Sequence, residues 1–223
     1  MADPVGVRRS VAVAVAAASV FAFAGCGRDY TDTAAPVVIA TPGDAGAYHG
    51  VELQQPISKP DVMLQDTTGA PFNLAQDTAG ELVLVYAGYT HCPDVCPTTM
   101  ADISVALRAL APQERQRVTV VMFSTDPVRD TPQRMRAFLD QFDPDFIGVV
   151  GQESVQIAAV NAMGIDVQAP TVAENGDVLV EHGAQVLAFA PPSDQAGLLW
   201  TSGTTASEFR EDIQTLLAAT PTG

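Results

Sequence analysis

Tyr89-Thr90-His91-Cys92-Pro93-Asp94-Val95-Cys96-Pro97 holds two of the three cysteines of this 223-residue chain. It closely follows Leu82-Val83-Leu84-Val85-Tyr86, an apolar run whose length and branched side chains are typical of a buried strand. Beyond it, apolar residues recur at helical spacing, at Met100, Ile103, Leu107 and Leu110. We therefore expect both thiols at a strand-to-helix junction, where free backbone N–H groups and the helix dipole favour thiolates. A thiolate is a redox nucleophile and a soft metal ligand, so the segment indicates thiol redox chemistry, soft-metal binding, or both.

Strand and helix patterns alternate along the rest of the chain. Val62-Met63-Leu64-Gln65 and Pro71-Phe72-Asn73-Leu74 predict an early hairpin, and Asn175-Gly176 predicts a turn between two later strands. Further strands are expected near 118–124, 146–150, 186–189 and 198–200. Helices are expected after Thr131-Pro132, over 155–163, and after a capping box of Thr205 and Glu208.

This alternation predicts an α/β fold with a mixed, partly parallel central sheet flanked by helices, preceded by the N-terminal hairpin. A cysteine pair after an early strand of such a sheet is typical of a thioredoxin-like fold. Thioredoxins separate their cysteines by two residues, whereas Cys92 and Cys96 are separated by three.

The N-terminal residues predict export. Arg8 and Arg9 precede an uncharged run over 11–24, which has the length of a signal-peptide core and is short for crossing a bilayer. The run ends in Phe23-Ala24-Gly25-Cys26, which resembles a bacterial lipobox. We therefore expect a lipoprotein signal peptide over 1–25 and lipidation of Cys26, so that the protein is anchored in the cell membrane and faces the extracytoplasmic side. An ordinary secretory signal and an uncleaved anchor are the alternatives, and both also export the protein.

Residues 26–57 are expected to form a flexible tether, because Asp, Thr, Pro, Gly and Ala dominate and no periodic apolar pattern appears. His49 lies in this segment and is expected to be exposed and without a function. The remaining residues, 58–220, are enough for one well-buried domain and too few for two.

The charge balance argues against nucleic acid as a partner. The chain has 26 acidic and 11 basic side chains, and removing residues 1–25 takes away Asp3, Arg8 and Arg9, which leaves 25 and 9, a net charge of −16. This balance argues against binding to nucleic acid or anionic headgroups through a basic patch, and it is compatible with a basic partner. The charges are scattered along the sequence, as on a solubilising surface.

Two cysteines four residues apart on a helix share one face, with Cα atoms about 6 Å apart. That geometry suits the chelation of one ion, and it also lies within the range that a disulfide tolerates. A third ligand must come from His49, His91 or His182. His91 stands at a strand end, where neighbouring side chains point to opposite faces. His182 follows the run Val178-Leu179-Val180-Glu181, at the rim of the predicted sheet.

Three blocks of the sequence resemble the SCO/SenC family of copper-binding assembly proteins. They are Tyr86-Ala87-Gly88-Tyr89-Thr90-His91-Cys92-Pro93-Asp94-Val95-Cys96-Pro97-Thr98-Thr99, Ser124-Thr125-Asp126-Pro127-Val128-Arg129-Asp130-Thr131-Pro132 and Phe142-Asp143-Pro144-Asp145-Phe146-Ile147-Gly148. The resemblance covers roughly residues 58–218. It implies an outward-facing, membrane-anchored thioredoxin-like domain that binds copper through Cys92, Cys96 and a distant histidine, matched here by His182. The family's Asp-rich Gly turn is replaced by Pro191-Pro192-Ser193-Asp194-Gln195-Ala196-Gly197, which we interpret as a longer loop.

The resemblance implies a copper metallochaperone that serves assembly of the copper centre of cytochrome c oxidase. The ligand set suits Cu(I) and also holds Cu(II) with a tetragonal addition. Asp126 is either a partner of the metal loop or simply a turn residue before Pro127. The implied partners are the copper-bearing oxidase subunit or another copper chaperone, with the membrane bound through the lipid anchor. The alternatives are a thiol–disulfide reductase acting on exported or oxidase-subunit cysteines, and a thiol peroxidase with Cys92 as its peroxidatic residue.

Overall fold

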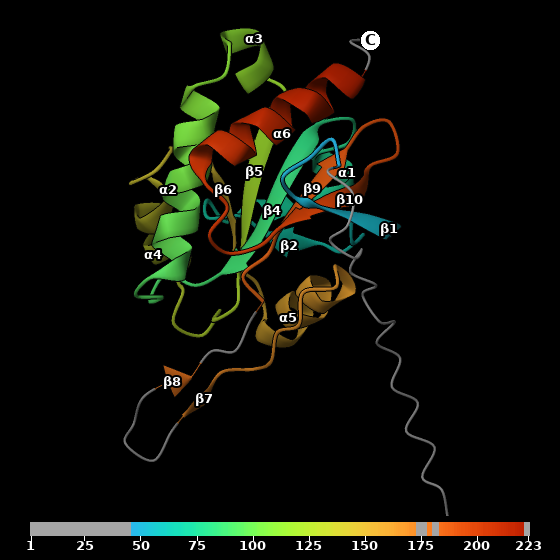
Figure 1. Cartoon of the computed structure of the whole chain (residues 1–223). Coiled ribbons are helices and arrows are strands. Elements are labelled where there is room, and N and C mark those ends of the chain that lie inside the picture. The colour runs from blue at the N-terminus through green and yellow to red at the C-terminus, as the bar shows by residue number, and fades with distance from the viewer. Residues whose placement is uncertain (1–45, 173–177, 180–182, 221–223) are drawn as a thin grey trace, which may run out of the picture. The chain divides into compact units, whose positions relative to one another are not determined.

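A six-stranded mixed sheet forms the centre of the domain in the computed structural model, which describes residues 46–172, 178–179 and 183–220 (Figure 1). Cys26 and His182 therefore lie outside the described residues. The strand order is β1-β10-β9-β4-β5-β6. The strands are β1 (Val51–Ser58), β4 (Leu82–Gly88), β5 (Val118–Ser124), β6 (Ile147–Val149), β9 (Val186–Ala190) and β10 (Gln195–Trp200). β4, β5 and β6 are parallel, while β9 runs antiparallel to β4 and β10, and β1 runs antiparallel to β10, so the predicted mixed α/β fold is confirmed.

Both faces of the sheet are covered, which explains why all seven residues of β4 are buried. Alternate residues of β4 enter two different hydrophobic cores. One core contains Leu84 and Tyr86 together with residues of α2 (Val95–Arg108), α4 (Pro132–Leu139) and α6 (Ala206–Ala219). The other contains Val83 and Val85 together with residues of α5 (Glu153–Ala162). Figure 1 shows α2 and α6 side by side over the first face, so the cysteine helix packs on the sheet next to α6.

The starts of α4 and α6 form where the sequence predicts them. The Thr131 hydroxyl accepts a hydrogen bond from the Arg134 amide at 3.2 Å, with Pro132 at the first helical position of α4. Thr205 and Glu208 form the predicted capping box of α6, in which the Thr205 amide donates to the Glu208 carboxylate at 2.7 Å. Two short helices, α1 (Leu74–Asp77) and α3 (Pro112–Arg115), complete the set in the described part of the chain.

Two hairpins agree with the sequence patterns. β2 (Leu64–Gln65) pairs with β3 (Pro71–Phe72), and the Asp66 carboxylate stabilises the turn by accepting from the Thr68 amide at 2.8 Å. β7 (Thr171–Val172) pairs with β8 (Val178–Leu179), and the predicted Asn175-Gly176 turn between them lies outside the described residues.

The tether prediction is wrong for residues 51–57, because they form most of β1, which pairs with β10. The Asp212 carboxylate of α6 secures the approach to β1 by accepting from the backbone amides of His49 and Gly50, both at 2.8 Å. The His49 ring is partly exposed, as expected, but it contacts Glu211 at 2.9 Å. The sequence pattern of β1 is weak because it is an edge strand in which only Leu53 is buried.

The long loop predicted over 191–197 is also wrong. β9 and β10 are joined by only four residues, 191–194, and Gln195 already pairs with Ala190. Asp194 at this turn accepts from the buried Lys59 ammonium at 2.8 Å. The hairpin pairing therefore absorbs Gln195, Ala196 and Gly197 into β10.

Of the helices in residues 46–172, 178–179 and 183–220, none has both the length and the apolar character that crossing a bilayer requires.

Candidate metal centre

Cys92 and Cys96 lie at the predicted strand-to-helix junction. β4 ends at Gly88 and α2 begins at Val95, so Cys92 lies just before the helix and Cys96 in its first turn. Both are free thiols in the structure, Cys92 half-buried and Cys96 fully buried. The backbone amide of Cys96 donates to the Cys92 sulfur at 3.4 Å. The helix start therefore directs a hydrogen-bond donor at the more accessible thiol, as expected for an anion site at a helix N-terminus.

The two thiols differ in acidity because their surroundings differ. Burial works to raise the pKa of the Cys92 thiol, but the backbone amides of Asp94 and Cys96 donate to its sulfur, and the net effect lowers the pKa. Burial raises the pKa of the Cys96 thiol to about 12. Cys92 is thus the readier thiolate of the pair, and Cys96 keeps its proton at neutral pH.

Tyr86 and Gly88 shape the space around the Cys96 sulfur. The Tyr86 hydroxyl, fully buried, donates to the Cys96 sulfur at 3.3 Å. A methyl group at Gly88 would stand 3.0 Å from the same sulfur, so this glycine leaves the room that the thiol occupies. Sequence reasoning assigned neither residue to the site. The available signal was strand alternation, which puts both on the same face of β4.

Asp130 connects the cysteine loop to the end of β5. Its fully buried carboxylate accepts from the Thr90 amide at 3.1 Å, the Thr90 hydroxyl at 2.6 Å and the Ser124 hydroxyl at 2.7 Å. Sequence reasoning also missed this residue, although it lies inside the second block of family resemblance. The two hydrogen bonds from Thr90 fix the chain two residues before Cys92, and the Ser124 bond ties the carboxylate to the end of β5.

The His91 ring contacts Arg134 and Asp130. Its Nε2 contacts the Arg134 guanidinium at 3.1 Å, and its Nδ1 lies 3.6 Å from the Asp130 carboxylate. This agrees with the expectation that it points away from Cys92. Within residues 46–172, 178–179 and 183–220, no group of three or more His, Cys, Asp or Glu side chains is arranged to hold a metal ion. Of the three expected ligands, the structure therefore describes Cys92 and Cys96, and His182 lies outside the described residues.

Asp126 occupies the turn after β5, where its buried carboxylate forms an ion pair with Arg129. Its backbone carbonyl accepts from the Arg129 amide at 3.1 Å, as in the turn-residue interpretation. Its second carboxylate oxygen has no hydrogen-bond partner among the described residues. The described contacts of Asp126 are thus with its own turn, and one buried oxygen retains the capacity to accept a further bond.

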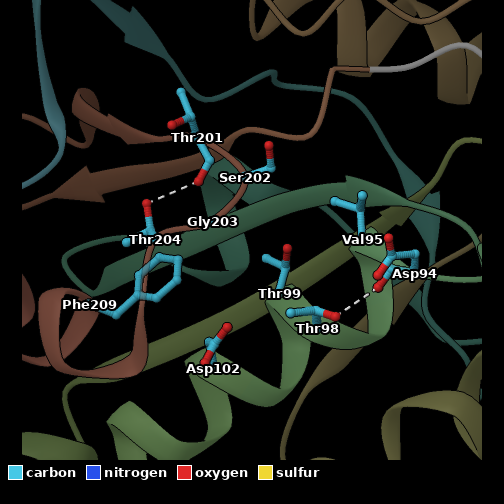
Figure 2. A pocket seen from close by; sticks show the side chains of 10 residues that line it. All are labelled: Asp94, Val95, Thr98, Thr99, Asp102, Thr201, Ser202, Gly203, Thr204 and Phe209. Atoms are coloured by element: carbon cyan, nitrogen blue, oxygen red, sulfur yellow. Dashed lines mark hydrogen bonds between the residues drawn. The ribbon is translucent and has the colours of Figure 1, made fainter.

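A cleft of about 180 Å³ separates the start of α2 from residues 201–204 (Figure 2). The carboxyl-bearing residues Asp94 and Asp102 line it on the α2 side, together with Thr99, and Phe209 lines it from α6. Asp94 lies between the two cysteines in the sequence, and its side chain makes no capping hydrogen bond to α2. A molecule that reaches the Asp94 end of this cleft therefore contacts the cysteine segment.

The fold and the thiol pair define a thioredoxin-like protein whose cysteines bracket the start of the first long helix. The SCO1/SenC family model matches residues 52–218, and the chain belongs to this family. This confirms the resemblance seen in the three sequence blocks.

Individual relatives are similar over most of the folded domain. SCO2 of Saccharomyces cerevisiae mitochondria is 27% identical over 172 residues, which cover 75% of this chain and 55% of the relative. The solution structure of apo Sco1 from Thermus thermophilus is 29% identical, with a TM-score of 0.67, covering 78% of this chain and 99% of that one. The structure of Bradyrhizobium japonicum ScoI with copper bound is 27% identical, with a TM-score of 0.59, covering 73% and 98%. The chain spans 67%, 55% and 39% of the length of three curated relatives that it matches.

Proposed function

We propose that the chain is an exported, membrane-anchored copper metallochaperone that assists assembly of the copper centre of cytochrome c oxidase. Copper would be its cargo, bound by Cys92, Cys96 and His182. The observation that carries the proposal is the pair of free thiols at the start of α2, with a backbone amide 3.4 Å from the first sulfur. Two thiolates and an imidazole are the donors that suit Cu(I). The copper in the B. japonicum structure supports the choice of metal.

The unequal exposure of the thiols suggests how copper enters and leaves. Cys92 is accessible to a partner's ligand, whereas Cys96 is closed off by Tyr86 and the sheet. We expect exchange to begin at Cys92 and to finish at Cys96, whose proton is released when copper binds. The third ligand, His182, would complete the site.

Copper titration of the purified protein tests the ligand set. One copper per chain should bind, and Cu(II) should produce a sulfur-to-copper charge-transfer band in the visible. Cys96→Ser should lose that stoichiometry or that band, and retention of both would refute the chelate. His182→Ala should weaken binding without abolishing Cu(I) capture by the thiolates. An unchanged affinity and spectrum in that variant would remove His182 from the ligand set.

We propose that Cys26 is the lipidated N-terminus and anchors the protein on the outer face of the cell membrane. The support is the Phe23-Ala24-Gly25-Cys26 pattern after an apolar run of signal-peptide length. Mass spectrometry of the membrane fraction should find a modified Cys26 at the mature start. A Cys26→Ser variant should leave the membrane, and one that remains equally bound would show that residues 11–24 persist as an anchor.

The proposed recipient is the copper-bearing oxidase subunit, with another copper chaperone as the alternative partner. Mixing the copper-loaded protein with the copper-free soluble domain of that subunit should move copper to it, as read by the absorption spectra of both proteins. The net charge of −16 after removal of residues 1–25 favours a recipient with a basic docking face, so added salt should slow copper transfer between the two proteins. Copper that stays on the chaperone at equilibrium would contradict this recipient.

A second function, thiol–disulfide reduction, is favoured by one observation: the accessible thiol comes first and the buried thiol second. The Cys92 thiolate would attack a target disulfide, and Cys96 would then displace the target. The target gains two thiols and the chain is left with a Cys92–Cys96 disulfide. In that case Cys96→Ser traps a mixed disulfide on Cys92. Reduction of a target without copper, and trapping in the variant, would establish this activity; failure of both would exclude it.

A further inference from the structure

Tyr86 is a polar residue on an otherwise apolar face of β4. Leu82 and Leu84 precede it on the same face, and all three are buried in the core that also holds α2. A phenylalanine would fill the same volume in that core without the hydroxyl. The hydroxyl must therefore be explained by what it contacts, since a buried polar group without a partner is costly.

The hydroxyl contacts the second thiol of the pair. It donates to the Cys96 sulfur at 3.3 Å, and both side chains are fully buried. The backbone amide of Tyr89 also donates to this sulfur. The Cys96 sulfur thus has two hydrogen-bond donors directed at it from the strand-to-helix loop and from β4.

Thr99 lies beside the Tyr86 hydroxyl. It follows Cys96 by three residues on α2, on the same side of the helix, and while burial raises the pKa of the Tyr86 phenol, the Thr99 side chain lowers it, as a donor to the phenol oxygen does. A phenol has only one proton, so a hydroxyl that accepts from Thr99 keeps its own proton for the sulfur. Thr99 also lines the cleft beside the cysteine segment, as Figure 2 shows.

We propose that Tyr86 is a positioning residue whose hydroxyl holds the Cys96 sulfur and favours its electron-rich, reduced form. A disulfide sulfur is a poorer acceptor than a thiol or thiolate, so this hydrogen bond stabilises the reduced pair. The same bond withdraws electron density from a thiolate that is bound to copper. The copper half of the inference rests on the proposed function, whereas the redox half concerns the copper-free protein alone.

The redox half is tested by equilibrating copper-free protein with glutathione. Each oxidised pair consumes two glutathione thiols and yields one glutathione disulfide, so the ratio at equilibrium gives the constant for reduction. In Tyr86→Phe this constant should fall roughly 2- to 10-fold, the effect of one net hydrogen bond. Tyr48→Phe is the matched control, because Tyr48 is partly buried against the same core and its charged neighbours are Glu52 and Asp212. A constant in Tyr86→Phe equal to that of the unaltered protein and the control would overturn the proposal.

The Cu(II) spectrum supplies a readout that packing alone would not move. Without the donor, the sulfur orbitals rise in energy, and the charge-transfer band of Tyr86→Phe should move to longer wavelength. A band at the original wavelength would contradict the copper half. If the unaltered protein binds no copper, the proposed function fails, and the glutathione equilibrium still decides the role of Tyr86. If Tyr86→Phe does not fold, Thr99→Val should lower the reduction constant in the same direction, and an unchanged constant there refutes the proposal.

Discussion

Replacing Gly88 with Ala adds one methyl group where β4 meets the cysteine loop. The new carbon would stand 2.5 Å from the Tyr86 ring, 3.0 Å from the Cys96 sulfur and 3.1 Å from the Met122 methyl group. All three neighbours are fully buried, so none can swing out into solvent. The strand or the ring must therefore shift, and the Cys96 sulfur shifts with them.

Overfilling a packed core by a methylene costs typically about 1–3 kcal/mol. Gly-to-Ala replacement also restricts the unfolded chain, which returns about 0.4–1 kcal/mol where the backbone tolerates alanine. Gly88 does not adopt a positive φ angle, so that gain applies. We expect a net loss of about 1–2 kcal/mol in the free energy of unfolding. Copper affinity should fall as well, because the crowded atom is a proposed ligand.

The assay is urea unfolding of the reduced, copper-free protein, followed by copper titration in competition with a chelator. Gly197→Ala is the matched control, since Gly197 lies in β10 and a carbon added there meets no atom within 4 Å. The control should be unchanged, or more stable by up to about 1 kcal/mol, and should bind copper normally. If Gly88→Ala matches the control in both stability and copper affinity, the close packing around Cys96 is not what limits this position.

Three further predictions concern the cysteine loop and its support. Asp130→Ala should lower the free energy of unfolding by about 2–4 kcal/mol, because the Thr90 and Ser124 hydroxyls lose their buried acceptor. Chemical denaturation measures this loss. A loss below about 0.5 kcal/mol would mean that water replaces the carboxylate. Alkylation of Cys92 should rise with pH and reach half of its maximum at a lower pH than in an unstructured cysteine peptide, because the pKa of this thiol is lowered, whereas Cys96 in Cys92→Ser should stay unreactive at about pH 8. A Cys92 midpoint at or above that of the peptide contradicts the first part. Copper binding and disulfide formation should compete for the same two sulfurs, so the oxidised protein should bind no copper until it is reduced. Counting free thiols before and after Cu(I) addition tests this. Equal copper affinity of the oxidised and the reduced protein would exclude the competition.

The starts of α4 and α6 could be predicted because their causes are local. The Thr131 hydroxyl accepts from the amide of Arg134, three residues later in the chain. Thr205 and Glu208 form reciprocal capping hydrogen bonds within one turn. β4 and β5 were equally clear, since both are buried on two faces and their runs are apolar throughout. The helical spacing expected for Cys92 and Cys96 does not belong with these, because α2 begins only at Val95 and Cys92 lies in the loop before it.

The errors fall where pairing with a distant strand matters. β1 becomes a strand because β10, more than 130 residues later, supplies its hydrogen-bond partners, and its own sequence has a single buried residue. Gln195, Ala196 and Gly197 look like a loop by composition, yet pairing with β9 on one side and β1 on the other includes the first two in the sheet. Strand propensity is weak at both places, and tertiary context overrides it.

The cysteine site likewise has features that the sequence determines and features that the fold determines. The amino-acid sequence alone specifies the thiol pair, its position after β4 and the family to which the chain belongs, because these depend on residues that are neighbours in the sequence. The surroundings of the thiols come from folding. Asp130 supports Thr90 from forty residues away, and Tyr86 reaches Cys96 only because α2 packs back onto the face of β4 that carries it. Hydrogen bonds of this kind require two segments to be brought within about 3 Å, and only the packing of the helix against the sheet does that.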